Sequence, residues 1–232
     1  MKTLLSKRTN EKITGMFFIA ATVSAITGML LYEPVLSASG FLDSIDQFSV
    51  QITSGAFFEL ILAISNIGTG IMLFPFLKLH DESWSLAYAF FRLLEVVFIL
   101  IGVTCMLSIV NLGTNYLNLS NEYKALAQDS ADIFKMIYGW VFILGPHFML
   151  GVNTFIYSII FYTTNMVPRK LAALGVIGSV LIFLAALLEI FGIIEHYSTQ
   201  VMIFAFPIAI YEMILAYWLI RKGFNIYYNE YI

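Results

Sequence analysis

Charged residues are scarce in this chain of 232 residues, since Asp, Glu, Lys and Arg together make up 12% of it. Soluble domains carry about 25% charged and about 45–50% apolar residues, whereas 60% of this chain is hydrophobic. Intrinsic disorder needs the opposite balance, with low hydrophobicity and high charge, and is excluded. A soluble globular fold is also disfavoured, because a chain of this length cannot bury so much apolar surface.

Cysteine is nearly absent as well, because Cys105 is the only one. The chain therefore has no internal disulfide and no cysteine-rich metal site. Its 12 Lys and Arg residues against 15 Asp and Glu residues give a net charge of −3, so nucleic acid is not an expected partner. The Walker A loop, the GxGxxG fingerprint, the HExxH zinc motif and the GxSxG elbow are missing. We expect no catalytic residues, no metal and no cofactor, and the sequence favours a protein that is not an enzyme.

Long apolar runs are what the chain has in abundance. A helix that crosses a bilayer needs about 20 mostly apolar residues, and the runs that satisfy this are 13–32, 51–77, 84–110, 134–162, 171–193 and 199–220. The first run exceeds the usual core of a signal peptide, about 7–15 residues, so we expect it to be retained. No connection between the runs is long enough for a separate domain. Residues 1–232 therefore predict one all-α membrane domain, a bundle of six transmembrane helices in a lipid bilayer.

Positive charge is distributed unevenly among the loops between these runs. When the two sides of the membrane are numbered alternately from the N-terminus, nine of the 12 Lys and Arg residues fall on the first side. Cytoplasmic loops carry such an excess, so both termini are predicted to lie in the cytoplasm, with the protein in a cell membrane. The longer connections, 33–50 and 111–133, then lie outside, and the second is expected to form one or two helical turns after Glu122.

Ionisable side chains inside the predicted spans are the candidates for function, because each charge there costs several kcal/mol. Arg92 and Glu95 lie in the third helix, three residues apart, so they share a face and can pair. Glu59 lies in the second helix on the same face as Asn66. Each group has two interpretations, a structural one in which it joins helices and a functional one in which it binds an ion or a solute.

The later spans add two further candidates. Glu212 lies in the sixth helix, five residues after Pro207, which can kink the helix beside the acid. His147 follows Gly145 and Pro146 in the fourth helix, where it is either a hydrogen-bonded structural residue or a group that titrates in a proton path. Glu189 lies near the outer end of the fifth helix and is expected to reach the interface.

The balance of these buried charges suggests how they are arranged. Glu59, Glu95 and Glu212 are acids, and Arg92 is the one certain cation among them. One acid can pair with Arg92, and the others must be protonated, hydrated or paired with His147. The sequence therefore predicts that the acids surround one central polar pocket, and that at least one of them exchanges a proton.

In these features the chain resembles an uncharacterised bacterial membrane-protein family, labelled domain of unknown function 4386, over residues 8–224. The matching segments are Gly15, Glu33-Pro34, Gly55 to Leu60, Phe91 to Glu95, Leu144-Gly145, Val167 to Arg169, Gly175 to Gly178, Pro207 to Met213 and Trp218 to Phe224. The resemblance implies a helical integral membrane protein without an established activity. It also implies that Glu59, Arg92, Glu95 and Glu212 belong to the family pattern, whereas His147 has no place in it.

Two functions remain open from the sequence. The first is a small transporter or permease-like protein, whose pocket of Glu and Arg residues near the midplane binds a small polar or cationic solute or a proton. The alternative is a non-catalytic accessory, sensor or stress-related protein, in which the buried charges only stabilise the bundle. An intramembrane enzyme is least favoured, because no nucleophile–base pair or metal-ligand set is present.

Overall fold

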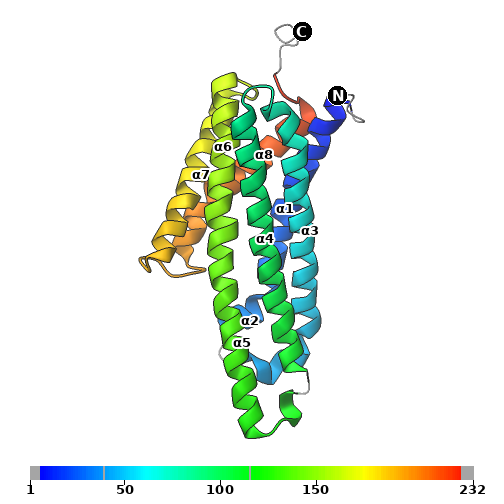
Figure 1. The fold of residues 1–232 in the computed structure, drawn as a ribbon, viewed down its shortest axis with the longest axis vertical. Coiled ribbons are helices and arrows are strands. Elements are labelled where there is room, and N and C mark those ends of the chain that lie inside the picture. Colours follow the sequence, from blue (N-terminus) through cyan, green and yellow to red (C-terminus); the bar gives the residue numbers. More distant parts are fainter. Residues whose placement is uncertain (1–5, 39, 115, 226–232) are drawn as a thin grey trace.

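The computed structural model describes residues 6–38, 40–114 and 116–225, and within these ranges the chain is helical and contains no strand (Figure 1). The long helices are α1 (Lys7–Leu31), α3 (Ile45–Leu77), α4 (Glu82–Gly113), α5 (Asn121–Phe142), α6 (Leu150–Thr164), α7 (Arg169–Ile190) and α8 (Thr199–Arg221). Between them lie the short α2 (Glu33–Ser37), the 3₁₀ turns η1 (Phe41–Ser44) and η2 (Tyr116–Asn118), and a π-helical turn, η3 (Ile143–Met149), which joins α5 to α6.

Six of these helical segments are long and apolar enough to cross a membrane, when α5, η3 and α6 are taken as one. The prediction of an all-α bundle of six spans is therefore confirmed. The fourth span differs from its prediction, because α5 begins at Asn121, where a loop with one or two helical turns was expected up to residue 133. The reason is that the first half of α5 is amphipathic, so a search for apolar runs misses it.

The long helices close into a ring in which each packs on its neighbours. Around this ring the order is α1, α3, α4, α6, α7 and α8, and α8 returns to α1. Figure 1 shows α8 passing obliquely behind α6 and α4 to reach α1 at the end of the bundle where α1 begins. We call this the terminal end, and the opposite end, where α5 begins, the far end.

Two apolar clusters fill the ends of the bundle. The cluster at the terminal end is built around Tyr88, Tyr157 and Phe161, and that at the far end around Tyr32 and Tyr138. Along α3 the first cluster uses residues 73–77 and the second uses residues 45–56. The stretch of α3 between them carries buried polar side chains, which therefore lie between the two apolar clusters.

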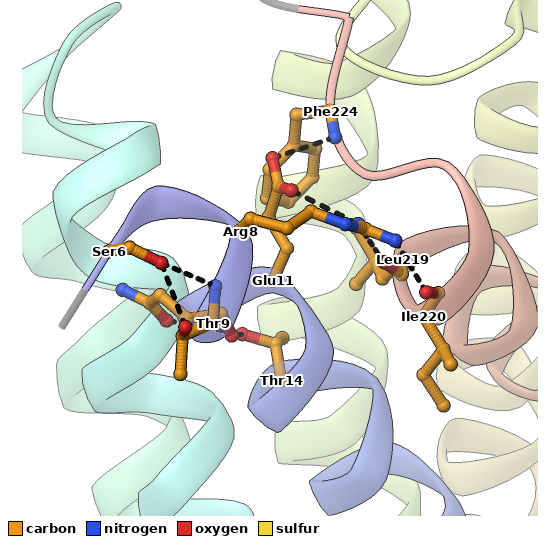
Figure 2. Close-up of polar contacts among 9 residues, drawn as sticks. Ser6, Arg8, Thr9, Glu11, Thr14, Leu219, Ile220 and Phe224 are labelled. Atoms are coloured by element: carbon orange, nitrogen blue, oxygen red, sulfur yellow. Dashed lines mark hydrogen bonds and ion pairs between the residues drawn. The ribbon is translucent and has the colours of Figure 1, made fainter.

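The terminal end is closed by polar contacts between α1 and the end of α8, drawn in Figure 2. Arg8 donates to the carbonyl oxygens of Leu219 (2.7 Å) and Ile220, which have no partner inside the helix. Glu11, only 3% exposed, lies 3.2 Å from Arg8 and accepts a hydrogen bond from the backbone N–H of Phe224 at 3.0 Å. These contacts fasten the beginning of α1 to the end of α8.

Gly223 makes this closure possible, and its replacement gives a first prediction. Its φ of +81° lies in the left-handed region, and a Cβ there would collide with the Glu11 carboxylate. We expect Gly223→Ala to lower the free energy of unfolding by more than the ~1–2 kcal/mol that the left-handed backbone alone costs. Gly192→Ala is the matched control, because Gly192 has a φ of +68° with open space around it. Thermal unfolding in detergent should rank Gly223→Ala below Gly192→Ala, and equal losses would contradict this account.

Candidate functional site

A cavity of about 260 Å³ lies on the far side of the bundle centre, between α1 and α8. Its polar lining consists of Thr22 on α1, Glu59 on α3, Tyr138 on α5, His147 on η3 and Glu212 on α8. The other lining residues are apolar and include Ala25, Ile26, Met29, Leu30, Leu62, Phe98, Ile99, Ile182, Ala205 and Ile208. The cavity is therefore a largely apolar chamber with a few convergent polar groups, the usual character of a small-molecule site.

Two carboxyl groups in the lining are almost buried and bind no cation. Glu59 is 6% exposed, and the Tyr138 hydroxyl donates to its Oε1 at 3.2 Å. Glu212 is 9% exposed, and the Thr22 hydroxyl donates to its Oε2 at 3.4 Å. No Lys, Arg or His in the described part of the chain forms an ion pair with either of them. Both acids thus keep hydrogen-bonding capacity directed at the cavity.

Arg92 and Glu95 form a separate, fully buried network. Arg92 Nη1 lies 3.0 Å from Glu95 Oε2, and Arg92 Nε donates to the Thr69 hydroxyl at 3.0 Å. Glu95 also accepts from the side-chain amides of Asn66 (2.9 Å) and Asn153 (2.6 Å). The pair on one helix face expected from the sequence is present. Neither residue lines the cavity of Glu59 and Glu212, so the buried charges fall into two groups.

His147 belongs to the cavity and owes its position to the π-helical turn η3. Pro146 has no N–H to donate to the preceding turn, and π-helical turns inside α-helices are frequent at functional sites. The His147 Nδ1 lies 2.7 Å from Oε2 of Glu189 on α7. Phe142 packs edge-on against the His147 ring, with centroids 4.9 Å apart.

Glu189 is where the structure corrects the sequence analysis. The acid was expected to reach the interface, but it is only 2% exposed. The connection between α7 and α8 folds back over the end of α7, with Tyr197 at a positive φ of 58°, and brings His196 Nδ1 to 3.5 Å from Glu189 Oε1. Helix position alone therefore overestimated the exposure of Glu189.

Both groups also contain side chains that were not predicted from the sequence. Asn153 was passed over, although an amide inside an apolar span is itself a signal. Tyr138 and Thr22 carry no such signal, because aromatic and small hydroxyl residues are common in membrane helices. In the part of the chain that the structure describes, no three His, Cys, Asp or Glu side chains are placed to hold a metal ion.

Comparison with known proteins gives one informative match. No curated protein matches this chain, and no solved structure matches it. A family model described as "Domain of unknown function (DUF4386)" matches residues 13–223, which include every residue of the cavity and of the Arg92 network. This helical membrane protein, with two nearly buried acids facing an apolar cavity, belongs to the DUF4386 family.

Proposed function

We propose that this protein is a membrane carrier for small amphipathic organic cations, which bind in the cavity between α1 and α8. The observation that carries the proposal is the pair of nearly buried carboxyl groups, Glu59 and Glu212, which face an apolar chamber without a cation. The sequence supports a location in a cell membrane with both termini in the cytoplasm, because Lys and Arg gather on that side.

The two acids in the lining determine the charge of the solute that the cavity can bind. A carboxylate in an apolar site is costly unless a positive charge accompanies it, and the nearest buried guanidinium, Arg92, is already held by Glu95. A bound ammonium or phosphonium group would supply the missing charge between Glu59 and Glu212. An anion would meet two acids instead, so the lining disfavours it.

The volume of the cavity and its apolar lining favour a small amphipathic solute. The cavity volume of about 260 Å³ lies just below the range of about 300–1,000 Å³ that holds drug-sized ligands, so the site suits a small molecule. Apolar side chains from α1, α4 and α8 surround the two acids and would cover the hydrocarbon part of the solute. These features match a cation that carries apolar groups better than a small inorganic ion, which would need more oxygen ligands.

We infer that the cavity opens between α1 and α8. Ile26 and Leu30, on the α1 side of the lining, are 55% and 62% exposed on the outer surface of the bundle. In a bilayer these side chains face lipid, so a solute that partitions into the membrane would reach the cavity from the side. Towards the terminal end the same helices are joined, because Arg8 and Glu11 bind the end of α8. Release on the other side would require these contacts to part.

The proposal is tested with benzyltrimethylammonium as the probe, an amphipathic cation small enough for the cavity. We expect the purified protein to bind the labelled cation in equilibrium dialysis, and we expect Glu59→Gln and Glu212→Gln each to weaken binding at least about tenfold, or about 1.4 kcal/mol. Gln keeps the shape and removes the charge. Glu82→Gln is the control, because Glu82 lies at the terminal end in an exposed pair with Lys78.

Proteoliposomes then separate a carrier from a protein that only binds. Uptake of the labelled cation by vesicles with the native protein, and its loss with Glu212→Gln, would support transport. Binding that needs Glu59 and Glu212 without any uptake would favour the alternative, a membrane sensor. Native protein that does not bind the cation, or variants that bind it equally well, would overturn the proposal.

A further inference from the structure

A row of three ionisable side chains leads from the cavity to the surface at the connection between α7 and α8. His147 lines the cavity, its Nδ1 contacts Glu189 Oε2 at 2.7 Å, and Glu189 Oε1 lies 3.5 Å from Nδ1 of His196. The exposure of the three side chains rises from 8% and 1% at His147 and Glu189 to 39% at His196. The row thus has one end in the cavity and the other in solvent.

We propose that His196, Glu189 and His147 form a proton path between the cavity and the surface at the α7–α8 connection, so that binding and release of a cation are exchanged against a proton. The coupling to a cation rests on the proposed function, whereas the path itself does not. Chains of Asp, Glu and His side chains conduct protons in membrane pumps and transporters, and imidazole is the side chain that gains and loses a proton nearest to neutral pH.

Glu189, the central residue of the row, supports this role, because one of its two carboxyl oxygens lacks the hydrogen bond that a purely structural acid would have. Its Oε1 is buried and has no hydrogen-bond partner in the described chain, although His196 lies within ion-pair distance. A buried unpaired oxygen costs about 1–3 kcal/mol, and a small rotation of His196 would complete the contact. The carboxyl group is therefore poised between two imidazoles and fully bound by only one of them.

The loop that carries His196 is held against the bundle by further contacts. The His196 ring packs edge-on against Trp140 at 5.7 Å, and Tyr197 packs on Phe142 at 5.3 Å. Tyr197 takes a positive φ of 58°, a backbone conformation that costs a non-glycine residue of order 1–3 kcal/mol and often marks functional sites. A loop without a role near Glu189 would have no evident reason to keep this strain.

The proton would move from the cavity to the surface in two transfers. The His147 Nδ1–H is transferred to Oε2 of the Glu189 carboxylate while Nε2 of the same ring takes a proton from the cavity, which leaves a neutral acid. Half a turn of the carboxyl group about its Cγ–Cδ bond then brings the proton to Nδ1 of neutral His196, which passes it to water. An inward proton follows the same steps in reverse and restores the first tautomer of His147.

Other ionisable groups near the path act at its two ends. Glu59, Glu212 and Tyr138 face His147 across the cavity from α3, α8 and α5, and the two acids are where the proton would reside. The Arg92–Glu95 pair lies on α4, which packs against η3. Its electrostatic effect on the path does not change as the proton moves. At the outer end, Tyr197 adjoins Glu189, and the exposed Glu195 precedes His196.

A pH jump tests the path without any ligand. Infrared spectroscopy of the purified full-length protein follows the carbonyl band of protonated carboxyl groups as the cavity acids take up protons. We expect His196→Gln and Glu189→Gln each to slow the growth of the band at least about tenfold, the low end of what a positioned proton carrier contributes. The final amplitude should stay unchanged in His196→Gln.

The controls keep the result unambiguous. His80→Gln alters a histidine at the terminal end, between α3 and α4, and should keep the native rate. His196 is exposed, so its variant is expected to fold, as its unfolding temperature will verify. Native rates in both path variants, or a carboxyl band that does not respond to pH in the native protein, would overturn the path.

A second measurement separates the path from the carrier. Protons released on addition of benzyltrimethylammonium are followed in stopped flow with a pH dye. If the path and the carrier are both right, His196→Gln binds the probe with native affinity but releases protons about tenfold more slowly or worse. If the native protein does not bind the probe while the pH-jump rates still depend on His196 and Glu189, the carrier fails and the path stands.

Discussion

Arg92→Met is expected to destabilise the protein by about 3–5 kcal/mol, the cost of breaking a buried ion pair from one side. The variant removes the only cation within 4 Å of Glu95 in the described chain and leaves that acid 3% exposed, with Asn66 and Asn153 as its remaining partners. A carboxylate cannot stay charged there at low cost. Chemical unfolding in mixed micelles, with helix content as the signal, measures the loss.

The double variant makes this prediction specific to charge. Arg92→Met together with Glu95→Gln removes both charges and keeps similar volumes. Because neutral replacements of a buried pair are often tolerated or even stabilising, the double variant should regain most of the stability lost in Arg92→Met. If the double variant is as unstable as the single one, the loss comes from packing of the Arg92 side chain and not from the uncompensated acid.

Gly178→Leu is the second variant with a large expected effect, because it forces α7 and α8 apart. A Cβ on Gly178 would stand 2.9 Å from the backbone nitrogen of Ile208 and 3.2 Å from the carbonyl carbon of Pro207. These are backbone atoms, so no side-chain rotation can relieve the clash. Overpacking costs about 1–3 kcal/mol and occasionally more, and we expect the upper part of this range in thermal unfolding.

Gly139→Ala is a control for which we expect a gain in stability instead of a loss. It lies in α5 with nothing near the place of its Cβ, so Gly139→Ala should stabilise the helix by up to about 1 kcal/mol. Since Ile208 lines the cavity one residue after Pro207, Gly178→Leu should also weaken binding of benzyltrimethylammonium. A variant with native stability and native binding would contradict the close packing of α7 on α8.

The sequence was a good guide to the fold because length and hydropathy alone specify a membrane helix. Six apolar runs predicted six spans, and the described residues contain six helices long and apolar enough to cross a membrane. Boundaries were predicted less well, most clearly at α5, whose amphipathic first half packs Ala127 and Ala131 into the far-end cluster. Such a helix has a half-polar composition and resembles a loop when only apolar runs are counted.

The candidate site was predictable in its members and not in its grouping. Charge at membrane depth singled out Glu59, Arg92, Glu95 and Glu212, and the spacing of three residues paired Arg92 with Glu95. The balance of charge also predicted one pocket for Glu59, Glu95 and Glu212, and Glu59 and Glu212 line one cavity whereas Glu95 does not. Which helices adjoin depends on packing between distant segments, so nothing local could separate Glu95 from the other two acids. The same holds for Glu189, whose burial depends on a loop that folds back over it.

The π-helical turn η3 has a consequence for the direction in which side chains point. Tyr138 and His147 are nine residues apart, and since a regular α-helix advances about 100° per residue, they would point to opposite sides of it. A π-helical turn takes about one residue more than an α-helical turn, so the rotation per residue falls and His147 comes round towards the cavity that Tyr138 also lines. The direction of His147 therefore depends on the helical phase between it and Tyr138. Loss of a single residue from 143–145 would turn the imidazole away from the cavity, although every lining side chain would remain in the sequence.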